Sequence, residues 1–158
     1  MPPPNRAARW FEHPLRTAVA AVVSLVVARQ FRLPEAYWAP LTTLVVTQSS
    51  VRAALGSSGQ RLAGTALGAV VGALIAAFWS ASLWSLAAGI FALGVLSFVL
   101  KLGNNAYRFA GITLIIVLII PQPHAPWILA WRRFLEVAIG IAVALGLTAI
   151  WPEGAAGN

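Results

Sequence analysis

Apolar runs separated by short polar or proline-containing breaks make up most of the chain. The runs cover about residues 15–32, 37–50, 61–79, 83–100, 108–120 and 127–151. A membrane-spanning helix needs about 20 predominantly apolar residues, and several of these runs approach that length. The pattern therefore predicts an all-α integral membrane protein with six transmembrane helices in a single bundle.

The breaks set the expected boundaries of this module. Residues 1–14 are rich in proline and polar residues, which is typical of a short tail at the membrane interface. Residues 15–152 form the six-helix module, and a loop is expected over Val51–Gly59 because glycine and serine are frequent there. Residues 153–158 form a C-terminal tail.

The composition agrees with a membrane protein. Of the 158 residues, 59% are hydrophobic and only 9% are charged, and the mean hydropathy is +0.81. Charged residues make up about 25% of an ordinary soluble domain. Val26-Val27-Ala28 resembles the cleavage site of a secretory signal peptide, which is an alternative for the first run. The same apolar texture continues along the chain, so a membrane-spanning module is favoured.

The basic residues are distributed like the charges that flank membrane spans. The net charge is +7 and the pI is near 11.6, but the basic residues stand singly or in pairs, so nucleic acid is not an expected partner. With the N-terminus inside, seven basic residues lie on the cytoplasmic side and four outside. The seven are Arg6, Arg9, Arg16, Arg52, Arg61, Lys101 and Arg108, and the four are Arg29, Arg32, Arg132 and Arg133. The positive-inside rule then places both termini in the cytoplasm.

The residue types that carry most catalytic chemistry are scarce. The chain has no Cys and no Asp, and its two histidines, His13 and His124, each stand alone beside prolines. No second ligand lies at helical or turn spacing from either histidine, so neither a metal site nor a cofactor is expected. A nucleophile, a base and an orienting group cannot be assembled, so the chain is not expected to be an enzyme.

Charged residues inside a span are the first candidates for function, because a charge at membrane depth is costly. Arg132, Arg133 and Glu136 begin the sixth run, and Glu136 is four and three residues from the two arginines. Glu136 can therefore form an ion pair within its own helix. The alternative is a proton-sensitive carboxylate that faces a cavity.

Two further arginines are expected at the starts of helices. Arg61 begins the third run and Arg108 the fifth, where Asn104 lies four residues earlier on the same face. Each arginine is either a positive-inside anchor or a cation that lines an anion path. The free amides of a helix N-terminus attract anions, which favours the second interpretation.

Small and hydroxylated residues occupy single faces of two runs. Gly64, Gly68 and Gly72 are spaced four apart, a pattern that lets two helices approach closely. Thr43 and Thr47 give the second run a hydroxyl face. These hydroxyls either bond to carbonyls of their own or a neighbouring helix, or line a water-filled route.

Several blocks of residues together resemble the membrane module of the FUSC family. They are Tyr37–Thr43, Gln60–Thr65 with the glycine row, Tyr107–Phe109, Arg133-Phe134 with Glu136, and Trp151-Pro152. The family includes the fusaric acid resistance proteins, the aromatic acid exporters and, more distantly, the plant aluminium-activated malate transporters. The resemblance implies a six-helix module in the inner membrane that moves organic anions, often aromatic carboxylates, out of the cell.

The resemblance also supports roles for individual residues. It implies that Glu136 is an arginine partner or a proton-coupling group. The candidate anion contacts are Arg61, Arg108 and Arg133, and the further candidates for lining the route are Asn104, Trp38, Thr43 and Thr47.

The expected function is a membrane transporter or channel for organic anions. Larger members of the family carry two such modules or a cytoplasmic domain, whereas this sequence holds one module, so a homodimer or higher homo-oligomer in membrane lipid is expected. The rival is a non-transporting membrane scaffold or regulatory subunit of a larger complex.

Overall fold

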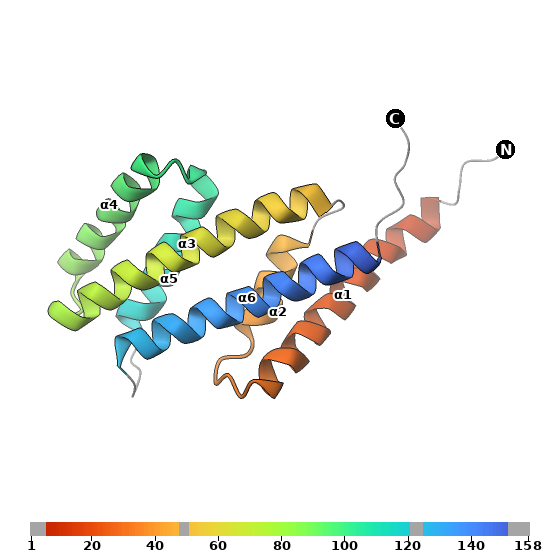
Figure 1. The fold of residues 1–158 in the computed structure, drawn as a ribbon, viewed down its shortest axis with the longest axis horizontal. Helices are drawn as coiled ribbons and strands as arrows, with labels where there is room; N and C mark the ends of the chain where they lie inside the picture. The colour runs from red at the N-terminus through yellow and green to blue at the C-terminus, as the bar shows by residue number, and fades with distance from the viewer. Residues whose placement is uncertain (1–5, 48–50, 121–124, 152–158) are drawn as a thin grey trace. The chain divides into compact units, whose positions relative to one another are not determined.

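The computed structural model describes residues 6–47, 51–120 and 125–151, and these residues form helices and turns without any strand (Figure 1). The helices are α1 Arg6–Gln30, α2 Trp38–Val46, α3 Val51–Phe78, α4 Leu83–Val99, α5 Gly103–Ile119 and α6 Pro126–Ile150. The all-α prediction is confirmed for these residues.

The prediction of six membrane spans is only partly supported. In the described part of the chain, two helices are long and apolar enough to cross a membrane, Arg52–Phe78 in α3 and Pro126–Ile150 in α6. The helices α4 and α5 are apolar but shorter, with 17 residues each. At 1.5 Å per residue such a helix is about 26 Å long, slightly less than the roughly 30 Å hydrocarbon layer.

The second predicted span ends earlier than expected, at Val46, and the predicted loop is helical; residues 48–50 of that span lie outside the described residues. The helix α2 has nine residues, so it is about 14 Å long and cannot cross the hydrocarbon layer alone. Residues 51–59, which were expected to form a loop, are the first turns of α3. No proline interrupts α3, and the burial of Ala54 and Ser58 on one face of this segment offsets the weak preference of Gly56 and Gly59 against helix. The first helix likewise starts at Arg6 inside the predicted tail and contains Pro14.

The chain divides into two compact units. Unit 1 comprises residues 1–58 and 138–158, and unit 2 comprises residues 59–137. The helices α3 and α6 contribute residues to both units.

In unit 1, α1 and α2 pack around a cluster of alanines. Ala28, Ala36 and Ala39 are buried and are covered by Leu25, Leu33 and Ile139. Small side chains let backbones approach closely, as they also do at Gly140 of α6. A Cβ atom at Gly140 would lie 2.5 Å from the carbonyl oxygen of Ala39, so only glycine fits there.

The turn that ends α1 holds a basic residue in the left-handed conformation. Arg32 has a φ of 53°. The amide of Leu33 donates to the carbonyl of Ala28 at 3.3 Å, and the amide of Arg32 donates to the carbonyl of Arg29 at 2.9 Å. This pair of bonds is a Schellman motif, in which glycine is the usual left-handed residue.

In unit 2, the glycine row joins α3 to α5. A Cβ atom at Gly64 would collide with the carbonyl of Ala106, one at Gly68 with the carbonyl of Ala110, and one at Gly72 would lie 3.1 Å from Cβ of Val117. The contacts advance together along both helices, so α3 and α5 run parallel. The partner of the glycine row is therefore a helix of the same chain. Leu93 of α4 and Leu114 of α5 are fully buried in the cluster beside this interface.

Candidate functional site

Polar and cationic side chains gather at one end of unit 2. We call this the polar end, and it consists of Gln60, Arg61, Lys101, Asn104, Asn105 and Arg108. The amide Nδ2 of Asn105 donates to Oε1 of Gln60 at 3.1 Å, which joins the first turn of α5 to α3. The end of α4 reaches the same place, because only a short turn separates Val99 from Gly103. Arg61, Asn104 and Arg108, which the sequence singled out separately, thus lie toward the same end of unit 2.

Arg61 is buried beside an aromatic ring. Its side chain is 7% exposed, and its Cζ lies 4.5 Å from the ring centroid of Phe109. The close approach of α3 and α5 at Gly64 explains this contact, since Gly64 lies one turn after Arg61 and faces Phe109. A cation over the face of an aromatic ring is attracted by the ring quadrupole.

The expectation that Arg61 starts a helix is wrong. Because α3 begins at Val51, Arg61 lies in its third turn, where the backbone amides are bonded within the helix. Asn104 does lie in the first turn of α5, and Arg108 follows one turn later. Asn104 and Arg108 are both exposed, in contrast to Arg61.

Arg133 and Glu136 form a buried ion pair on α6. Nη1 of Arg133 lies 3.2 Å from Oε2 of Glu136, and the two side chains are 3% and 1% exposed. The other carboxylate oxygen of Glu136, Oε1, is buried without a hydrogen-bond partner in the described part of the chain. The pair lies in the second and third turns of α6, because that helix starts at Pro126. The three-residue spacing of Arg133 and Glu136 allows an ion pair within one helix, and the structure shows this pair.

The hydroxyl face of α2 is used for hydrogen bonds to backbone carbonyls. The hydroxyl of Thr43 lies 3.0 Å from the carbonyl oxygen of Ala39 and 3.1 Å from that of Gly140. The hydroxyl of Thr47 donates to the carbonyl of Thr43 at 2.7 Å. Thr43 and Thr47 are both buried. Their observed contacts are therefore those of helix packing.

The segment before α2 is organised around a carboxylate. Oε2 of Glu35 accepts hydrogen bonds from the hydroxyl of Tyr37 and from Nε1 of Trp38, both at 3.2 Å. Trp38, a candidate for lining the route, is half-buried at this position. The Tyr37-Trp38 pair thus holds the turn between α1 and α2.

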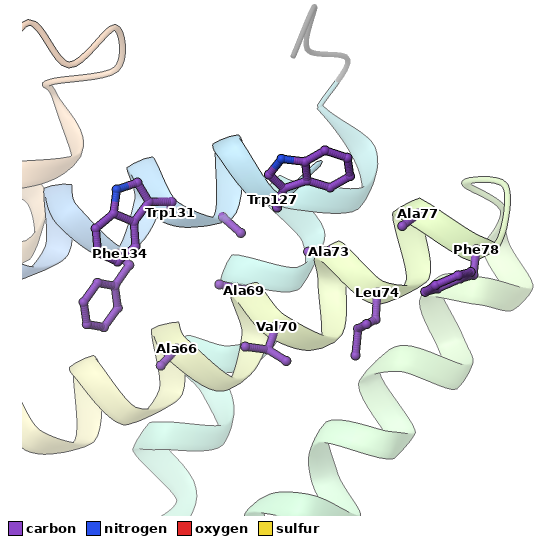
Figure 2. A pocket seen from close by; sticks show the side chains of 11 residues that line it. Ala66, Ala69, Val70, Ala73, Leu74, Ala77, Phe78, Trp127, Trp131 and Phe134 are labelled. Carbon is purple, nitrogen blue, oxygen red and sulfur yellow. The ribbon is translucent and has the colours of Figure 1, made fainter. Parts of the chain in front are cut away.

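An apolar groove of about 590 Å³ lies between α3 and α6 in unit 2 (Figure 2). Small residues of α3 form one wall, and Trp127, Trp131 and Phe134 of α6 project from the other. The rings of Trp131 and Phe134 are stacked, with centroids 5.8 Å apart. We did not predict this groove. The sequence does carry a signal for the groove. The three aromatic residues recur at a spacing of three or four residues, which places them on one face of a helix, and the alanines on α3 recur at the same spacing, at Ala66, Ala69, Ala73 and Ala77.

Metal-binding side chains are not clustered. Among the described residues, no group of three or more His, Cys, Asp or Glu side chains is placed to hold a metal ion. His13 is exposed on α1, and His124 lies outside the described residues.

Comparison with known proteins points to one family. The family described as fusaric acid resistance protein-like matches residues 17–147. The inner membrane protein YeeA of Escherichia coli K12 is 31% identical over 153 residues, which cover 90% of this chain and 41% of YeeA. The uncharacterized transporter YdhK of the same strain is 30% identical over 143 residues, which cover 85% of this chain and 21% of YdhK. The chain therefore spans less than half the length of either relative. No solved structure matches it.

Proposed function

The chain belongs to the fusaric acid resistance protein-like family, and from that premise we propose that it is a membrane transporter or channel for organic anions. The FUSC resemblance seen in the sequence is thereby confirmed. The name of YdhK supports transport in general, and the name of YeeA supports an inner-membrane location. The substrate class that we propose is the aromatic carboxylates, moved out of the cell.

The observation that carries this proposal is the burial of Arg61 against Phe109. Arg61 is a buried arginine whose Cζ lies over the ring of Phe109, and a buried ionisable residue in a membrane protein is a functional-site hypothesis by default. An aromatic carboxylate offers both complementary groups, since its carboxylate accepts charge-assisted hydrogen bonds from arginine and its ring stacks beside phenylalanine. Asn104 and Arg108 at the same polar end supply further donors where the anion enters.

We place the polar end on the cytoplasmic side. The opposite end of unit 2 exposes Phe78, Trp79, Trp84 and Trp127, without a basic residue among residues 78–84. Exposed tryptophans are typical of either membrane interface, whereas lysine and arginine are enriched on the cytoplasmic side. This arrangement supports the orientation inferred from the loop charges, with both termini in the cytoplasm.

The proposed route forms between two or more copies of the module. Arg61 does not line the apolar groove of Figure 2, and no charged residue does. The groove is therefore unsuited to conduct an anion within one copy. Formation of a homodimer or higher homo-oligomer would enclose the polar ends of the modules instead.

Flux of an aromatic carboxylate into proteoliposomes tests the role of Arg61. Losing a charge-assisted hydrogen bond costs about 1.5–3 kcal/mol, so Arg61→Ala is expected to reduce flux by about 10- to 100-fold. Arg108→Ala removes an exposed arginine and is expected to have a smaller effect.

The matched control for this test is Arg52→Ala, because Arg52 is an exposed arginine on the same helix as Arg61. Its flux is expected to stay within about twofold of the wild type, as for other surface substitutions. Wild-type flux in the Arg61→Ala protein would refute the role of Arg61. No flux by the wild type, together with a partner that co-purifies in fixed stoichiometry, would favour the rival scaffold function.

A proton-coupled mechanism is a second component of the proposal. The buried Oε1 of Glu136 has no hydrogen-bond partner among the described residues, while Oε2 is held by Arg133. A carboxylate with one oxygen bound to an arginine can accept a proton on its other oxygen. Transport by Glu136→Gln is then expected to lose its dependence on pH. An unchanged pH profile in that variant would exclude coupling through Glu136.

A further inference from the structure

A cavity of about 590 Å³ whose lining includes polar groups lies at the turn between α4 and α5 in unit 2, and we call it the polar cavity. Its lining includes Ser97, Phe98, Lys101, Asn104 and Tyr107. Among the residues that the structure describes, no acidic one lines it. The cavity therefore presents one cation and several hydrogen-bonding groups to a ligand.

Ser97 is the buried group in this cavity that lacks a partner. Its side chain is 6% exposed, and its hydroxyl oxygen has no hydrogen-bond partner among the residues that the structure describes. A buried hydroxyl is normally hydrogen-bonded, because leaving it unsatisfied is costly. An anion in the cavity would accept a hydrogen bond from this hydroxyl.

Lys101 occupies a backbone position that normally belongs to glycine. Its φ is 53°. Its amide donates to the carbonyl of Phe98 at 3.2 Å, and the amide of Leu102 donates to the carbonyl of Ser97 at 3.0 Å, which completes a Schellman motif. A lysine in this conformation is disfavoured relative to glycine, so its charge is retained at a conformational cost.

The start of α5 adds further positive potential. The helix begins at Gly103, and no side chain caps it at Leu102. Helix N-termini attract anions through their free amides. With Lys101 and Ser97 beside this helix start, the cavity matches a phosphate or carboxylate group.

An apolar hollow continues from the cavity along α4. It has a volume of about 340 Å³ and shares Gly94, Phe98 and Tyr107 with the polar cavity. Phe91 and Phe98 are 74% and 84% exposed, and Gly94 leaves a notch between them. A polar cavity next to an apolar notch on a membrane protein complements an amphiphile with an anionic head and a hydrocarbon chain.

We propose that the α4–α5 turn binds an anionic phospholipid, with the headgroup phosphate at Ser97 and Lys101 and an acyl chain in the notch at Gly94. A soluble phosphate or carboxylate carries the same anionic group as the headgroup, but it has no hydrocarbon chain to occupy the notch. The cavity shares Lys101 and Asn104 with the polar end, but Arg61 is not among its lining residues, and lipid binding there does not depend on what the protein transports.

Lipid binding to the purified full chain in detergent tests this proposal by native mass spectrometry. Phosphatidylglycerol is expected to bind at least tenfold more tightly than phosphatidylcholine, whose headgroup is neutral overall. Lys101→Gly is expected to lose most of this preference while keeping or raising the melting temperature of the lipid-free protein, because glycine suits the left-handed position.

The control is Arg32→Gly, which makes the same type of change in the Schellman motif at the end of α1 and is expected to leave phosphatidylglycerol binding unchanged. Gly94→Leu fills the notch, and it is expected to weaken phospholipid binding about tenfold. A Cβ atom at Gly94 would lie 3.6 Å from Tyr107, so the substitution begins at an ordinary contact distance.

Glycerol phosphate serves as the headgroup without a chain. Weak competition by glycerol phosphate, together with loss of binding in Gly94→Leu, supports a phospholipid. Equal competition, with Gly94→Leu unaffected, would overturn the lipid and indicate a site for soluble anions. Wild-type affinity for phosphatidylglycerol in Lys101→Gly would overturn the site altogether.

Discussion

Substitution of Gly68 by alanine tests how tightly α3 and α5 are packed. A Cβ atom at this position would collide with the carbonyl oxygen of Ala110 and lie 2.9 Å from its Cα. Both atoms belong to the backbone, so no side chain can rotate away. Carbon atoms prefer separations of about 3.5–4.0 Å, and the two helices must therefore part by about 0.6–1.1 Å.

The expected loss of stability can be calculated from the van der Waals attraction that is lost between α3 and α5. Each heavy-atom pair gains about 0.1–0.2 kcal/mol, and a gap of 0.5–1 Å forfeits a quarter to a half of it. For about 50 such pairs, the number made by one buried leucine, the loss is about 1–5 kcal/mol, with a central value of about 3 kcal/mol. Alanine regains about 1 kcal/mol of helix propensity over glycine. We therefore expect Gly68→Ala to lower the free energy of unfolding by about 1–3 kcal/mol.

Unfolding in detergent, followed by circular dichroism during a denaturant titration, measures this change. The control is Gly59→Ala in the same helix, where a Cβ atom would meet nothing within 4 Å. The control is expected to be neutral or to stabilise the protein by up to about 1 kcal/mol, because only helix propensity changes. Equal stability of the two variants would refute the close approach of α3 and α5.

Three further substitutions test buried contacts by the same titration. Glu136→Gln removes the buried carboxylate that pairs with Arg133 and is expected to cost about 3–5 kcal/mol; adding Arg133→Met should recover part of it, and strictly additive effects would contradict the ion pair. Thr43→Val keeps the volume but removes the hydroxyl, for an expected loss of about 0.5–1.5 kcal/mol, so an unchanged stability would show that this hydroxyl is unimportant. Gly140→Ala forces α2 away and is expected to cost about 1–3 kcal/mol, and a fully stable variant would disprove that contact.

The apolar runs predicted α4 and α6 to within about one residue at each end, because each of these apolar runs has the same extent as the helix that forms from it. The start of α3 was missed, because Gly56, Ser57, Ser58 and Gly59 have low intrinsic helix propensity. Propensity is a local quantity, and the context that holds these residues in a helix is not local. The same error placed Arg61 at a helix start, whereas it lies in the interior of α3.

The candidate site was predictable in its residue types but only partly in its contacts. The spacing of Arg133 and Glu136 within one helix was sufficient to suggest their ion pair. The contact of Arg61 with Phe109 joins two helices, and it depends on a close approach that spacing alone does not reveal. Ser97 gave no signal, since a single serine in an apolar run is unremarkable until its neighbours are known.

The left-handed turn at Lys101 also provides a site for selective chemical labelling. Lys101 is the only lysine in the sequence, so it carries the only side-chain amine, and it is exposed. A membrane-impermeant amine reagent, applied to one face of sealed vesicles, would modify this turn and the terminal amine alone. Peptide mapping separates these two positions, so the native protein can reveal which face of the membrane carries the α4–α5 turn. If the polar end is cytoplasmic, labelling at Lys101 requires inside-out vesicles.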